Sequence, residues 1–365
     1  MNILLFFIIL LVLVLVHEFG HFIVAKRSGI RVDEFGFGFP PRLFGIKKGE
    51  TTYSFNLLPF GGFVKIFGEN PDDESLSGPD AARSMVKKPK YIQAAVLFAG
   101  VAFNFILAWL LISSGFMAGL PTSGPVDSSL SYKEMPMLTI TSVVEGAPAD
   151  RAGFIAGDRI VAIDSQTGEI TNPDIEVFKT TVAENAGKNI LVEYERAGSR
   201  QSLVLVPEDG LVDGRAGVGV SLDVVGKVQL PVHTALAKGF LLTSRLTGET
   251  AVSLATLLRD AVLGKADLTQ VTGPVGLVGV VGDAYNFGIV HLLMLTAVIS
   301  INLAIINLLP FPALDGGRLL FLLIEKIKGS PITPKVANTL NTVGFFLLIA
   351  LMLLVTYHDI VKLVK

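Results

Sequence analysis

Four apolar stretches divide the chain. A helix needs about 20 residues to cross the ~30 Å hydrocarbon core of a bilayer, and each stretch approaches or exceeds that length. They cover approximately residues 3–25, 91–117, 288–309 and 339–357. The first has no basic segment before it and no small-residue cleavage site after it, so we expect a retained span rather than a cleaved signal peptide. The sequence therefore predicts a polytopic α-helical membrane protein with about four transmembrane helices.

Basic residues indicate the orientation of these spans. Eleven Lys or Arg residues lie between Lys26 and Lys90, and four more follow the third span: Arg318, Lys326, Lys328 and Lys335. By the positive-inside rule both loops are cytoplasmic, which places residues 120–287 outside. From Gly124 to Lys227 there are sixteen Asp or Glu against nine Lys or Arg. We therefore expect an extracytoplasmic soluble domain in this region.

The loop between the first two spans carries a β-prone region. Residues 36–41 are rich in turn formers, and residues 51–58 and 61–67 are apolar, β-prone and punctuated by glycine. Non-helical backbone at membrane depth is tolerated only where protein or a water-filled cavity satisfies it. We expect a membrane-associated, re-entrant β-hairpin that offers an edge to an extended substrate. A hairpin on the cytoplasmic membrane surface is an equally consistent alternative.

Composition supports a membrane protein and limits its chemistry. Hydrophobic residues make up 51% and charged residues 17% of the chain, and the mean hydropathy is +0.60. The absence of cysteine excludes disulfides and cysteine-ligated zinc. Nothing in the sequence indicates nucleic-acid binding, and we expect neither a nucleic-acid partner nor a nucleotide cofactor.

The first span contains the motif His17-Glu18-Phe19-Gly20-His21. On a helix, His17 and His21 share one face and can ligate one zinc ion, with Glu18 beside them as a base. Ionisable groups at membrane depth cost several kcal/mol unless they are paired, metal-bound or facing water, so a metal site is favoured over a packed or coincidental pair. His17 lies nine residues before Lys26, or ~13 Å, which predicts an active site near the cytoplasmic side.

A third ligand is expected at the end of the third span, because a catalytic zinc usually has three protein ligands. Asp315 is the only carboxylate in the apolar run from Ala284 to Gly317, and it lies at the same cytoplasmic level as the histidine motif. Two prolines before it break the helix, and two glycines after it let the backbone approach closely. Asp315 is therefore the predicted third ligand. An interfacial aspartate at a helix end is the alternative.

Taken together, H-E-F-G-H and N-L-L-P-F-P-A-L-D-G-G resemble the motifs of the site-2 protease family of intramembrane zinc metalloproteases, of the regulator of sigma-E protease type. Residues 36–44, 58–65 and 273–276 share this resemblance, whereas Val101 stands where relatives often have proline. The resemblance implies Zn²⁺ held by His17, His21 and Asp315, with Glu18 activating water. It also implies that Asn307 binds substrate backbone or the developing oxyanion. A helix-packing role for Asn307 is the alternative.

The outer region resembles a PDZ domain. Residues 140–164 read as strand, turn, short helix, turn and strand, and we place one α/β PDZ-like domain at 124–209. The segment Met135–Leu138 lacks the glycine usual in the peptide-binding loop. A steric filter that admits only trimmed substrates is therefore favoured over capture of peptide ends.

An amphipathic helix is expected within residues 231–287. Its charges share one arc of about 100° and are Lys238, Arg245, Glu249, Arg259 and Asp260. We expect this helix, with a break at Gly248 an open option, to lie in the outer membrane interface. Packing on the PDZ-like domain is the alternative.

These observations predict a zinc endopeptidase in the lipid bilayer of the bacterial inner membrane. It would cleave single-span membrane proteins in regulated intramembrane proteolysis, such as membrane-bound anti-sigma factors or remnant signal peptides. The N-terminal and C-terminal membrane cores would be residues 1–120 and 288–365. A catalytically inactive membrane scaffold presenting a PDZ-like module is the rival function. A soluble zinc peptidase on a signal anchor is disfavoured, because the motif lies inside the apolar run.

Overall fold

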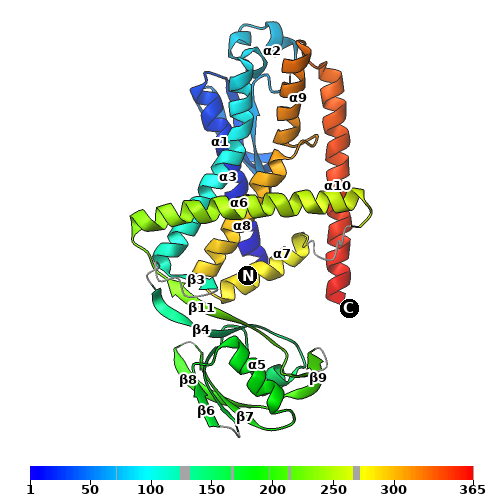
Figure 1. The fold of residues 1–365 in the computed structure, drawn as a ribbon. Coiled ribbons are helices and arrows are strands. Elements are labelled where there is room, and N and C mark those ends of the chain that lie inside the picture. The colour runs from blue at the N-terminus through cyan, green and yellow to red at the C-terminus, as the bar shows by residue number, and fades with distance from the viewer. Residues whose placement is uncertain are drawn as a thin grey trace. The chain divides into compact units, whose positions relative to one another are not determined.

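The structure is a computed structural model that describes residues 1–70, 72–123, 132–165, 168–196, 198–212, 215–265 and 272–364 (Figure 1). The chain forms two compact units. The helical unit comprises Met1–Ser114 and Leu236–Lys365, and the β unit comprises Gly115–Ala235. The β unit is therefore inserted into the sequence of the helical unit.

Four helices of the structure coincide with the four predicted spans. They are α1 (Asn2–Arg27), α3 (Lys90–Ala118), α8 (Ile289–Leu308) and α10 (Pro334–Val364). All four are long and apolar enough to cross a membrane. α10 begins earlier than the hydropathy pattern suggests, at a proline that suits the first turn of a helix because its missing N–H has no partner to lose there.

Further helical segments follow in the same chain: α2 (Asp73–Ser77), the 3₁₀ turns η1 (Ala81–Arg83) and η2 (Met85–Lys87), the long helix α6 (Val232–Val262), α7 (Pro274–Asn286) and α9 (Asp315–Lys328). α6 continues through Gly248, so a break there is not observed; one glycine costs a helix only about 1 kcal/mol relative to alanine. α6 packs on α3, where the Trp109 indole donates to the Leu236 carbonyl (2.8 Å). Whether α6 lies in the membrane interface stays a prediction.

The β-prone loop forms two long strands, β1 (Val32–Lys48) and β2 (Thr51–Ile66), which pair with each other. Phe35 of β1 has two cross-strand partners, Val64 and Tyr53, so the strands bend back on themselves. Segment 62–66 pairs only with residues 32–37 among the described residues, which leaves its other side as an edge. The predicted pairing is thus present, while its insertion into the membrane stays a prediction.

The helical unit is held together by two buried clusters. One joins the end of α1 to the β-strands and α3, and includes Phe22, Val32, Ile66 and Val96. The other joins the middle of α1 to α7 and α8, and includes Leu13, Val281 and Leu292. α1 is therefore fixed on several sides around its histidine motif.

The β unit contains a seven-stranded sheet in the order β3-β11-β4-β5-β7-β8, with β6 on β5. Its strands are β3 (Leu120–Ser123), β4 (Tyr132–Val143), β5 (Arg159–Ser165), β6 (Gly168–Thr171), β7 (Ile190–Arg196), β8 (Ser199–Leu205) and β11 (Val220–Val228). The short strands β9 (Glu208–Val212) and β10 (Arg215–Gly217) pair separately, and α4 (Pro148–Ala152) and α5 (Ile175–Glu184) are its helices. The core packs around Ile140, Phe154, Ile163 and Tyr194.

The sheet extends past the expected domain limits of 124–209. Residues 124–131 of the expected domain lie outside the described residues. Strand β11 begins after residue 209, the expected end of the domain. β11 inserts between β3 and β4, a long-range pairing that no local pattern reveals. Asp158 lies in residues 140–164, the stretch that resembles a PDZ domain. Its buried carboxylate accepts two hydrogen bonds from Arg196 (both 2.7 Å) and raises the pKa of that guanidinium. This aspartate therefore has a structural partner.

Candidate metal centre

The structure brings the three predicted ligands together. His17 and His21 lie one turn apart on α1, and their Nε2 atoms are 3.2 Å apart. Asp315, the first residue of α9, places Oδ2 3.0 Å from Nε2 of His17 and 3.2 Å from Nε2 of His21. Two elements separated by nearly 300 residues of sequence thus converge on one point.

The spacing of these three atoms fits a zinc ion. Bond lengths of 2.0–2.2 Å in a tetrahedral zinc site place neighbouring ligand atoms about 3.3 Å apart, and the observed separations are 3.0–3.2 Å. Both histidines are 6% exposed, so their polar atoms need partners within the protein. Within the part of the chain that the structure describes, no other group of three His, Asp or Glu side chains is close enough to share a metal ion.

Helix α3 supplies the outer partners of both imidazoles. Nδ1 of His21 donates to the Val96 carbonyl (2.8 Å), and Nδ1 of His17 lies 3.2 Å from the amide of Asn104. Gly100 lies midway between these two residues, and a Cβ atom there would come within 2.7 Å of the His17 and His21 rings. The spacing of four residues puts all three positions on one face of α3.

Sequence reasoning assigned no role to Gly100 or Asn104. The available signal was a glycine and an asparagine four residues apart inside an apolar span. Gly20 of α1 completes the close contact, because a Cβ atom there would lie 2.5 Å from the Ala99 carbonyl oxygen. The two helices therefore meet at their glycines, at the level of the imidazoles.

The segment before Asp315 turns sharply. Ala313 has a φ of +75°, a region that a side chain disfavours, and its N–H donates to the Asn341 side chain of α10 (3.2 Å). Gly316 and Gly317 follow, and a Cβ at either position would collide with the preceding backbone. The predicted close approach of backbone at this glycine pair is confirmed.

Glu18 opens onto a cavity of about 620 Å³ together with His21 and Asp315. The same cavity is lined by the edge of β2 and by Phe345 and Phe346 of α10. The predicted base therefore faces a cavity that is bordered by β2.

Asn307 is engaged elsewhere. Its amide donates to the Leu303 carbonyl of its own helix (3.0 Å), and it is not among the residues that line this cavity. Its role in substrate binding stays a prediction.

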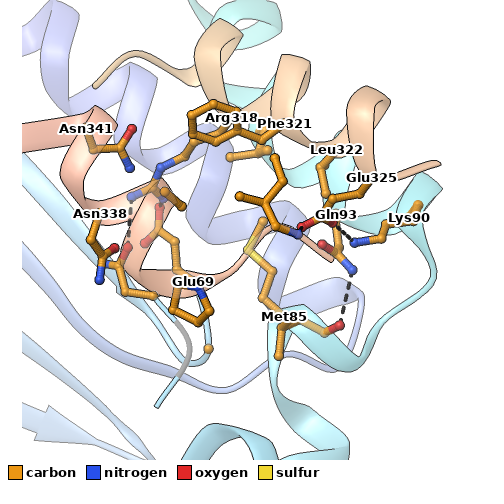
Figure 2. A pocket seen from close by; sticks show the side chains of 17 residues that line it. Glu69, Met85, Lys90, Gln93, Arg318, Phe321, Leu322, Glu325, Asn338 and Asn341 are labelled. Atoms are coloured by element: carbon orange, nitrogen blue, oxygen red, sulfur yellow. Dashed lines mark hydrogen bonds and ion pairs between the residues drawn. The ribbon is translucent and has the colours of Figure 1, made fainter. Parts of the chain in front are cut away.

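A second, smaller cavity of about 120 Å³ adjoins the first and shares Glu69, Leu97, Arg318 and Asn341 with it. Figure 2 shows the Arg318 guanidinium directed at the Glu69 carboxylate, with which it forms an ion pair. A second ion pair, Lys90–Glu325, lies in the same view. Two ion pairs therefore line the smaller cavity, and the Arg318–Glu69 pair lies at its junction with the larger one.

Comparison with known proteins is consistent with this geometry. The model of peptidase family M50 matches residues 5–351. A candidate zinc metalloprotease of Clostridium perfringens is 38% identical over 96% of this chain and 95% of its own length. Zinc metalloprotease RasP of Geobacillus kaustophilus is 31% identical over 98% of this chain and 97% of its own length.

Among solved structures, the PDZ domain of an SdrC-like protein from Listeria monocytogenes matches 24% of this chain and 86% of its own length, at 20% identity and a TM-score of 0.21. The match of the family model runs through nearly the whole chain and includes both metal motifs, and relatives matched over nearly their whole length are named zinc metalloproteases. Zinc is therefore the expected metal. This chain belongs to peptidase family M50, the site-2 protease family of intramembrane zinc metalloproteases.

Proposed function

We propose that His17, His21 and Asp315 hold the catalytic Zn²⁺ and that Glu18 is the general base of an endopeptidase acting on single-span membrane proteins. One observation carries the proposal: three side chains from α1 and α9 converge with their ligand atoms 3.0–3.2 Å apart. Glu18 opens onto the same cavity as two of them.

Bound zinc would lower the pKa of a water molecule toward 7 and polarise the scissile carbonyl. Glu18 takes a proton from the attacking water and delivers it to the nitrogen of the leaving amine as the C–N bond breaks. The products are a new carboxylate and a new amino terminus.

The edge of β2 supports an extended substrate. Segment 62–66 has strand partners on one side only among the described residues, and Phe63, Val64 and Ile66 line the cavity. A peptide added along this edge would pair its backbone with β2 beside Glu18. A helical membrane segment must unwind before it can bind in this way.

The proposed setting is the bacterial inner membrane, with the centre near the cytoplasmic side and the β unit outside. The support is the excess of Lys and Arg in the two loops assigned to the cytoplasm and of acidic residues in the β unit. Membrane-bound anti-sigma factors or remnant signal peptides are proposed substrates. The β unit would act as a size filter that admits trimmed substrates.

Two variants test the proposal in purified protein with a single-span reporter. Glu18→Gln should lower cleavage by at least about 10²-fold and leave the zinc content at one ion per chain. Asp315→Asn should lower the zinc content itself, since it removes a charged ligand. Unchanged turnover in Glu18→Gln would refute the enzymatic role of this site and favour the inactive scaffold.

A further inference from the structure

We propose that Asn104 fixes His17 in the form that binds metal, by accepting a hydrogen bond from the Nδ1–H of His17 through its amide oxygen. Asn104 is then a positioning residue, acting on the metal through His17. This inference rests on the proposed zinc site.

The Asn104 amide is fully enclosed. The residue is 0% exposed on the apolar helix α3. In the structure the amide nitrogen of Asn104 lies 3.2 Å from Nδ1 of His17, and the amide oxygen has no partner among the described residues. The oxygen and nitrogen of an amide have nearly the same shape, and a half-turn exchanges them. Packing therefore does not choose between the two orientations.

Zinc binding requires one of the two orientations of the Asn104 amide. A neutral imidazole carries one proton, so the nitrogen that binds zinc must be the one without it. If the Asn104 amino group donated to Nδ1, Nε2 would carry the proton and point it at His21 and Asp315. Zinc at Nε2 instead places the proton on Nδ1, which then needs an acceptor. The amide oxygen of Asn104 is that acceptor.

The neighbouring ligand follows the same rule. Nδ1 of His21 faces the Val96 carbonyl, which can only accept, so its Nε2 is left free for the metal. Metal-binding histidines almost always donate their second N–H to such an acceptor. α3 thus supplies a backbone acceptor for one histidine and a side-chain acceptor for the other.

Asn104 itself is held in place by a third helix. The Ser300 hydroxyl of α8 donates to the Asn104 backbone carbonyl (2.8 Å), and Ser300 is also 0% exposed. The buried bond links α8 to α3 at this residue. The amide therefore has a fixed backbone from which to reach His17.

The test measures zinc affinity by competition with a chromophoric chelator, in full-length protein. Asn104→Leu keeps the branched shape and the number of side-chain heavy atoms but removes the acceptor, so zinc binding should weaken about 10–100-fold. Asn104→Asp keeps an acceptor oxygen, so its affinity should stay within about threefold of the unmodified protein. Ser113→Ala is the matched control, because it removes a buried hydrogen bond of α3 to Trp109 that does not involve the site.

The outcomes separate this inference from the proposed function. Equal weakening in Asn104→Asp and Asn104→Leu, or unchanged affinity in Asn104→Leu, would overturn the inference while the unmodified protein still binds one zinc. Failure of the zinc site itself would appear as unchanged zinc binding in His17→Ala. If Asn104→Leu does not fold, as judged by its melting curve, the Asn104→Asp affinity alone decides.

Discussion

At Gly100 the imidazoles of His17 and His21 occupy the space that a side chain would need. A Cβ atom would approach both rings to 2.7 Å, closer than nonbonded carbon atoms allow, so Gly100→Ala must displace the rings or move α3 away from α1. We expect the zinc content to fall well below one ion per chain. Elemental analysis of the purified variant measures this, with Gly248→Ala as the control because its helix position has open space. Full zinc occupancy in Gly100→Ala would show that the helices can separate without cost to the site.

The residues of the site differ in how far sequence could predict them. His17 and His21 are one turn apart on one helix, so local periodicity places them together. Asp315 is far away in sequence, and its identification depended on its being the lone carboxylate at a matching depth. Gly100 and Asn104 acquire their roles only from the register of α3 against α1, which no local pattern specifies. The resemblance suggested a substrate-binding role for Asn307; its amide donates to its own helix in this structure, and the role stays a prediction.

Three elements meet at Glu50, in the turn between β1 and β2. Its carboxylate accepts from Lys26 of α1 (2.6 Å) and pairs with Arg83 of η1 (2.6 Å). The Lys26 ammonium is the main cause that lowers the pKa of the Glu50 carboxyl. A lowered pKa in the folded state stabilises the protein above the unfolded-state value of about 4.3, and this contribution is lost as the pH falls through the folded-state pKa.

Glu50→Gln should therefore lower thermal stability near neutral pH by about 1 kcal/mol or less, since the carboxylate is partly exposed. The difference from the unmodified protein should shrink at acidic pH, where both side chains are uncharged. Melting curves in detergent at pH 7 and at acidic pH measure it. Glu249→Gln removes a more exposed ion pair with Arg245 and should change little at either pH. A Glu50→Gln difference that persists in acid would assign the effect to shape rather than charge.

At the level of elements, hydropathy predicted the long helices, because about 20 apolar residues leave few alternatives. The strand order in the sheet of the β unit was harder to predict from the sequence. β11 starts after the expected end of the domain yet lies between β3 and β4, and such pairing depends on the whole fold. Residues 34–37 of β1 each pair with two residues of β2. This could not be predicted either, because the sequence shows only β-prone runs and not their register.

For the whole molecule, the division into two units indicates how the β unit can be removed. Its hydrophobic core draws only on residues 138–222, so the helical unit does not depend on that core for its own packing. The chain enters and leaves the unit at neighbouring points, because the Leu230 N–H donates to the Phe116 carbonyl (3.0 Å). A short Gly/Ser linker can therefore replace residues 119–228 with little strain on α3 and α6.

This deletion tests the β unit as a size filter. The full chain should cleave a single-span reporter with a trimmed outer segment at least about tenfold faster than one with a folded outer domain, a ratio that corresponds to about 1.4 kcal/mol of discrimination. The variant without residues 119–228 should cleave both at similar rates, because the obstacle is gone while the proposed metal ligands on α1 and α9 remain. Zinc content measured in parallel shows whether the helical unit is intact. Discrimination that persists in the zinc-loaded variant would place the filter in the helical unit, and loss of both cleavages with zinc retained would make the β unit part of substrate binding.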